Sequence, residues 1–85
     1  MKQVEIKLIQ LLDLLEFDTN VRIVLWGTTW DDNLEAKCWH EVIFEGKYQG
    51  NELLKRYENK KVVEFSCNIN HITIDISDTE VEHEN

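Results

Sequence analysis

A chain of 85 residues is long enough for one domain with a modest core. Its 42% of hydrophobic side chains predicts a packed interior rather than disorder. It has no apolar run approaching the roughly 20 residues needed to cross a bilayer. Seventeen acids against nine bases give a net charge of −8, which repels nucleic acid and attracts basic protein surfaces.

The first predicted element is a helix over residues 3–17. Its core-facing stripe has helical spacing and consists of Val4, Leu8, Leu11, Leu12 and Leu15. Ile6, Ile9 and Phe17 lie outside this stripe, which indicates a second contact, such as one with a second copy of the chain. The segment interleaves charges with apolar residues, so we do not expect a secretion signal and predict a cytoplasmic protein.

Two strands follow in the prediction. The side chains of residues 21–27 alternate between the two faces of a predicted strand, which ends at Gly27. Residues 28–33 form a polar turn whose aspartates can bond their own backbone. Residues 35–46 form a longer strand, in which one face carries Ala36, Cys38, His40, Val42 and Phe44. The opposite, solvent-facing side then carries Lys37, Trp39, Glu41, Ile43 and Glu45.

Residues 50–60 are predicted as a short helix with Asn51 at its N-cap, before strands at 61–69 and 71–77. The order helix, strand, strand, helix, strand, strand indicates an α+β domain. We expect the N-terminal helix to pack on a four-stranded, mainly antiparallel sheet. Residues 1–77 form this single domain, and residues 78–85 form an acidic tail.

Tryptophan and acidic residues provide the candidate site. Trp26 and Trp39 are predicted on the solvent face of neighbouring strands, with Trp30 in the connecting loop. Exposed indoles mark contact surfaces, although they can also simply cover a sheet. The predicted partner-binding residues are Trp26, Trp30, Trp39, Glu41, Glu45, Glu64, Asp75, Asp78 and Glu80.

The acidic end of the chain has a regular spacing. No Lys or Arg follows Lys61, and Glu80, Glu82 and Glu84 alternate. In an extended chain these carboxylates would share one side at about 6.8 Å intervals, similar to the advance of every second phosphate of a DNA strand. This predicts a surface that imitates a nucleic-acid backbone and binds a basic, nucleic-acid-binding protein. An ordinary solvated acidic end is the alternative.

Zinc binding and nucleophilic catalysis have less support. Cys38, His40, Cys67 and His71 offer a Cys₂His₂ zinc set, but their spacing is not that of a zinc finger, and burial of Cys38 and His40 in the core is the favoured interpretation. Cys67 and His71 lack a third orienting group for nucleophilic catalysis. We therefore expect no enzyme activity, no metal and no cofactor.

The segments "VLWGTTWDDNLEA" and "FEGKYQGNELLKRYENKKVVEFSCNINHITIDIS" resemble small uncharacterised proteins of Gram-positive phages and mobile elements. The shared pattern is a strand ending in a W-G turn, an F/Y-E-G step, a short Leu-Leu helix and a final hairpin, over most of residues 21–77. It carries no functional motif. Size, acidity and layout are also similar to anti-CRISPR and other phage-encoded inhibitors.

This similarity of physical type implies a non-catalytic inhibitor or adaptor that blocks a basic nucleic-acid site on a host defence protein. Three alternatives stay open. They are a homo-oligomeric module that associates through Ile6, Ile9 and Phe17, an immunity protein against a basic nuclease toxin, and a small zinc-binding module.

Overall fold

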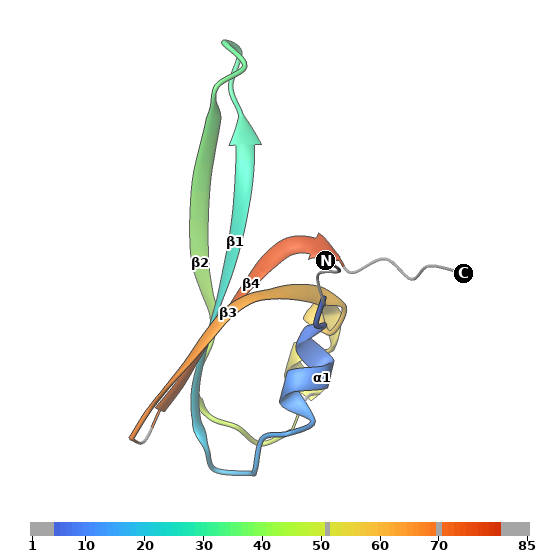
Figure 1. Ribbon diagram of the computed structural model, residues 1–85, viewed down its shortest axis with the longest axis vertical. Helices are drawn as coiled ribbons and strands as arrows, with labels where there is room; N and C mark the ends of the chain where they lie inside the picture. Colours follow the sequence, from blue (N-terminus) through green and yellow to red (C-terminus); the bar gives the residue numbers. More distant parts are fainter. Residues whose placement is uncertain (1–4, 51, 70, 81–85) are drawn as a thin grey trace, which may run out of the picture.

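The computed structural model describes residues 5–50, 52–69 and 71–80 and has an α+β fold, as predicted (Figure 1). A short helix and two hairpins follow one another along the chain. The elements are α1 (Leu8–Leu12), β1 (Asn20–Trp30), β2 (Ala36–Lys47), the 3₁₀ helix η1 (Glu52–Tyr57), β3 (Lys60–Asn68) and β4 (His71–Glu80).

The four strands form one mixed sheet in the order β2-β1-β4-β3. Each hairpin is antiparallel, but the inner strands β1 and β4 run parallel to each other. The prediction of a mainly antiparallel sheet with two α-helices was therefore wrong. β1 and β4 have the most apolar inner faces, and they are the two central strands of the sheet. They are buried because a central strand has a neighbour on both sides.

The N-terminal helix is much shorter than predicted. α1 spans Leu8–Leu12, and residues 5–7 are not helical. Lys7 is extended, and the N–H of Val62 donates to the carbonyl of Ile6 at 2.8 Å. After α1 the backbone makes hydrogen bonds of the 3₁₀ type. The N–H of Leu14 donates to the carbonyl of Leu11, and the N–H of Leu15 donates to the carbonyl of Leu12. Residues 3 and 4 of the predicted helix lie outside the described residues.

Of the three apolar residues outside the predicted helix stripe, two are exposed. Ile6 and Phe17 are 39% and 71% exposed, and Ile9 is half-buried. Phe17 also makes an edge-to-face contact with Tyr48, with ring centroids 6.1 Å apart. A contact with a second copy through these residues stays a prediction.

The core lies on one face of the sheet, beneath α1 and η1 (Figure 1). Two leucines of α1 and one of η1 pack there with Tyr48 against the inner strands. The fully assembled cluster consists of Leu8, Leu12, Val21, Ile23, Tyr48, Leu54, Ile74 and Ile76. The predicted inward face of the last strand is confirmed by Ile74 and Ile76, which are both 0% exposed.

We call the opposite side of the sheet the outer face. Side chains alternate along a strand, so it carries Arg22, Val24 and Trp26 of β1 and Thr73 and Asp75 of β4. Both α1 and η1 lie on the other side (Figure 1). None of the helices in the described ranges is long and apolar enough to span a membrane.

Candidate partner-binding surface

A two-stranded hairpin extends beyond the rest of the sheet (Figure 1). β1 pairs with β4 only as far as Trp26, opposite Ser77, whereas β1 and β2 remain paired to Trp30, opposite Ala36. We call residues 26–40 the projecting hairpin. Because most of it lacks a third strand within the described chain, it presents two faces and two backbone edges to a partner.

Asp31 organises the turn at the end of this hairpin. Its carboxylate Oδ1 accepts hydrogen bonds from the N–H groups of Asn33 and Glu35, both at 2.9 Å. The N–H of Asp31 also donates to the carbonyl of Glu35 at 3.1 Å. The predicted bonding of an aspartate to its own backbone is thus confirmed, but β1 continues to Trp30 and the turn begins only at Asp31.

Leu34 has an unusual conformation within that turn. Its φ is 61°, in the left-handed region that β-carbon-bearing residues rarely adopt, and its side chain is 79% exposed. Leu34 was not among the residues predicted from sequence to contact a partner. Its exposure could have been predicted, because a single leucine between polar neighbours in a turn has no buried position to occupy.

The three tryptophans all lie in the projecting hairpin but do not share one face. Trp26 is 40% exposed and lies against His40, with ring centroids 4.7 Å apart. Trp39 covers Gly27, and its indole fills the space that a Cβ there would need. Trp30 is 69% exposed and ends β1.

The predicted common solvent face for Trp26 and Trp39 was wrong. Their backbone partners are neighbours, since Trp26 pairs with His40 and Gly27 with Trp39, so the two indoles point to opposite sides. The cause is a bulge in β2, where Ile23 pairs with Phe44 but Val24 pairs with Val42. One extra residue reverses the alternation of every residue before it in β2.

The same bulge moves Cys38 and His40 out of the core. Both were expected to be buried beside Val42 and Phe44, and both are exposed on the outer face with Val42. The predicted interior face of this strand is therefore correct only at its Phe44 end.

Three of the predicted acidic contact residues do share the outer face. Glu45 pairs with Arg22, and Asp75 pairs with both Val24 and Glu64. The fourth, Glu41, lies opposite Leu25 and so on the other face, which corrects the prediction. The acidic surface is not unbroken, because Arg22 Nε lies 3.9 Å from Glu45 Oε2.

Two acids that we assigned to the tail belong to the sheet. β4 ends at Glu80, so Asp78 and Glu80 are strand residues. Asp78 is exposed, and its carbonyl accepts a hydrogen bond of 2.8 Å from Lys60 Nζ. Glu82 and Glu84 lie outside the described residues, and the alternating acidic strip of the tail stays a prediction.

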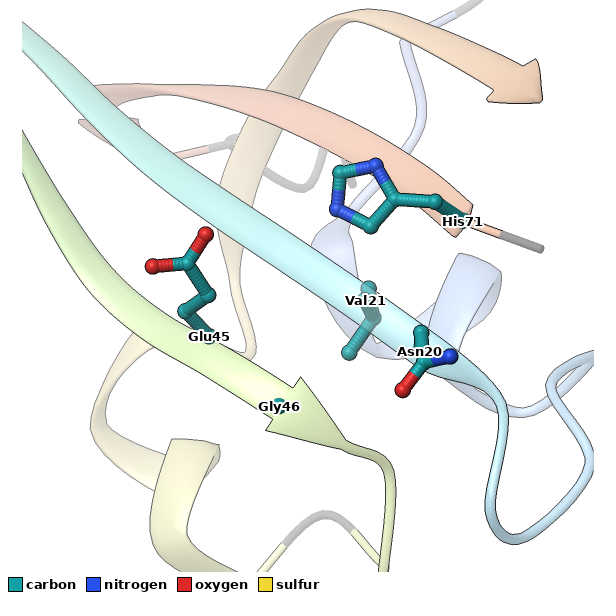
Figure 2. A pocket seen from close by; sticks show the side chains of 5 residues that line it. All are labelled: Asn20, Val21, Glu45, Gly46 and His71. Carbon is teal, nitrogen blue, oxygen red and sulfur yellow. The ribbon is translucent and has the colours of Figure 1, made fainter.

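A shallow depression of about 210 Å³ lies over the first residues of β1 (Figure 2). Figure 2 shows the carboxylate of Glu45 and the imidazole of His71 lining it together with Asn20. A carboxylate and an imidazole are two groups that can move protons. Among the described residues that line this depression there is no cysteine, serine or other nucleophile.

The four zinc candidates do not form one site in the described chain. Cys38 and His40 lie on β2, whereas Cys67 lies opposite Ile72 on β4 and therefore on the side of the sheet that faces α1. His71 is one residue from Ile72 and faces the other way. Within residues 5–50, 52–69 and 71–80, no three His, Cys, Asp or Glu side chains are placed to hold a metal ion.

Comparison of the chain with protein-family models, with curated proteins and with solved structures finds no match.

Proposed function

We propose that the protein is a non-catalytic binding protein whose projecting hairpin occupies a basic, nucleic-acid-binding surface of another protein. The observation that carries the proposal is the concentration of indoles and carboxylates on one hairpin. Residues 26–40 hold all three tryptophans, three carboxylates and a single lysine, Lys37.

The chemistry of the hairpin fits such a partner. Aromatic side chains supply much of the binding energy at protein interfaces, because they bury a large area with few rotatable bonds. Trp30 and Leu34 are 69% and 79% exposed, so they can enter a partner's pocket without first leaving their own core. Asp31, Asp32 and Glu35 surround them with negative charge.

The outer face extends this surface at the base of the hairpin. Glu45, Glu64 and Asp75 lie on the same side as Trp26. Glu64 and Asp75 are cross-strand partners, and like charges placed side by side favour a cationic ligand. Together with the net charge of −8, they accelerate encounter with a positively charged protein and make it sensitive to salt.

The proposed biological role is inhibition. An acidic protein that occupies a nucleic-acid-binding groove competes with the nucleic acid, as phage-encoded inhibitors of host defence do. The proposed site of action is the cytoplasm. An immunity protein against a basic nuclease toxin would use the same surface, and the identity of the captured partner distinguishes the two.

The test is affinity capture from lysate of the source organism, followed by a competition assay. We expect the captured protein to bind a labelled oligonucleotide that the wild-type chain displaces. Trp30→Ser should weaken displacement at least about tenfold, whereas Glu16→Gln, an exposed acid before the start of β1 and outside the projecting hairpin, should leave it unchanged. The proposal fails if the oligonucleotide stays bound at saturating inhibitor, or if capture is the same at low and high salt.

A further inference from the structure

The outer edge of β3 is only partly covered. β3 ends the sheet on one side, and its first residues meet the N-terminal segment: Val62 donates to Ile6, and Lys61 forms a bridge with Lys7. Beyond Val62, no described residue apart from those of β4 pairs with its backbone. Between Glu64 and Asn68, alternate residues therefore have N–H and C=O groups that point away from β4, and another strand can add to them.

A bulge at Val63 precedes a regular stretch of β3 from Glu64 to Asn68, and this stretch has few of the features that normally prevent such addition. Edge strands are commonly protected by charged residues, proline or bulges. The other edge of the sheet, β2, has a bulge and four charges, at Lys37, Glu41, Glu45 and Lys47. The regular segment of β3, "EFSCN", has a single charge at Glu64, and its Phe65 is 51% exposed. The apolar residues on either side of it, Val63 and Ile69, are 61% and 98% exposed.

The segment is also complementary to itself. We propose that two copies of the chain associate by antiparallel pairing of β3 with β3, with a two-fold axis at Ser66. Apolar residues then face apolar residues, and the single charge meets an amide rather than its own copy. The facing pairs are Glu64 with Asn68, Phe65 with Cys67, and Ser66 with Ser66.

The side-chain faces agree with this register. Phe65 and Cys67 pair with Ile74 and Ile72 of β4, so both lie on the face that α1 covers further along β3. Joining two copies would extend that apolar layer across the interface. An axis at Phe65 instead would place Asn68 opposite Val62, whose outward N–H already donates to Ile6. The axis at Ser66 uses only residues of the uncovered edge.

The dimer would have a defined architecture. Its strand order would be β2-β1-β4-β3-β3-β4-β1-β2, an eight-stranded sheet with one projecting hairpin near each end. Two hairpins in one particle can engage two sites at once, which raises avidity without a new contact. Each copy carries −8, so salt should strengthen the association by screening repulsion.

The experiment compares two substitutions that change the charge equally but have opposite expected effects. Ser66→Lys places two ammonium groups directly across the two-fold axis, whereas Asn68→Lys places each ammonium group against Glu64 of the second copy. Sedimentation of the full chain up to about 1 mM should show Ser66→Lys weakening the dimer at least about tenfold and Asn68→Lys tightening it about three- to tenfold.

The control is Asn33→Lys, which makes the same charge change in the hairpin turn, far from β3. Circular dichroism and urea unfolding establish that each variant is folded, and Asn68→Lys, at the end of the strand, tests the pairing even if Ser66→Lys does not fold. A wild-type chain that stays monomeric at every concentration and salt level overturns the proposal. So does a common shift in all three variants, or association that responds only to Asn33→Lys.

Discussion

β1 passes through two environments, and the contrast between them separates what stabilises this protein from what is free to bind. In its first half, Val21 and Ile23 are 0% exposed between β2 and β4. In its second half the strand pairs with β2 alone, and Trp30 is 69% exposed. Substitutions of the buried residues in the first half should change the free energy of unfolding, and those of exposed residues in the second half should mainly change binding.

The largest expected effect is in the body of the domain. Ile74 is 0% exposed at the centre of the core, and Ile74→Ala should lower the free energy of unfolding by about 2–5 kcal/mol, because it leaves a cavity. Thr29→Ala, at an exposed hairpin position, should change it by less than about 0.5 kcal/mol. Urea unfolding measures both, and equal effects would contradict the division between body and hairpin.

The next effect tests whether the hairpin has internal packing of its own. Gly27→Ala should cost about 1–3 kcal/mol, because the indole of Trp39 fills the position of the new Cβ. Urea unfolding together with the near-ultraviolet signal of the tryptophans measures this change. In a Trp39→Leu background the cost should be smaller, since the two residues are in contact. The same cost in both backgrounds would contradict the packing of the Trp39 indole against Gly27.

Part of this arrangement was predictable from sequence. The alternation of Ile72, Ile74 and Ile76 correctly indicated one buried face of the last strand, because a period of two has a single structural cause. The direction of its neighbour was not predictable. A parallel and an antiparallel partner require the same alternation, so periodicity carries no information on whether β1 and β4 run in the same direction.

The candidate site was less predictable because its geometry depends on one irregularity. Val42, Ile43 and Phe44 are three apolar residues in succession, so nothing in their order shows where the bulge interrupts the alternation. Extending the pattern from Phe44 assigned Trp39 and His40 to the wrong faces. The cluster of tryptophans is visible in the sequence whichever face of the strand each side chain occupies. Their orientation, in contrast, depends on the alternation of the strand and therefore on the bulge.

A smaller effect of opposite sign is expected at the hairpin turn. Leu34 has a φ of 61°, which glycine adopts without steric cost, so Leu34→Gly should raise the free energy of unfolding by about 0.5–1 kcal/mol. The same change should weaken binding to a captured partner, because it removes an exposed apolar side chain. Urea unfolding and a binding titration measure the two results. A more stable variant with unchanged binding would exclude Leu34 from the contact surface.

The smallest effect is a pH dependence confined to the body. Burial, and secondarily the negative charge of Asp13, raise the pKa of Tyr48 above its usual value of 10.0. The folded chain therefore holds the phenol proton more tightly than the unfolded chain. This contribution to stability is fully present below about pH 10 and is lost as the pH rises through the folded pKa.

Tyr48→Phe should flatten the fall in the free energy of unfolding above about pH 10, whereas Tyr57→Phe, at a half-buried tyrosine whose ring lies beside Arg56, is the matched control. Urea unfolding at a series of alkaline pH values gives the two slopes. Asp13→Asn should reduce the effect only partly, because burial is the larger cause. Since the projecting hairpin contains no tyrosine, the loss of stability should begin in the body, and an unchanged slope in Tyr48→Phe would assign the alkaline transition elsewhere.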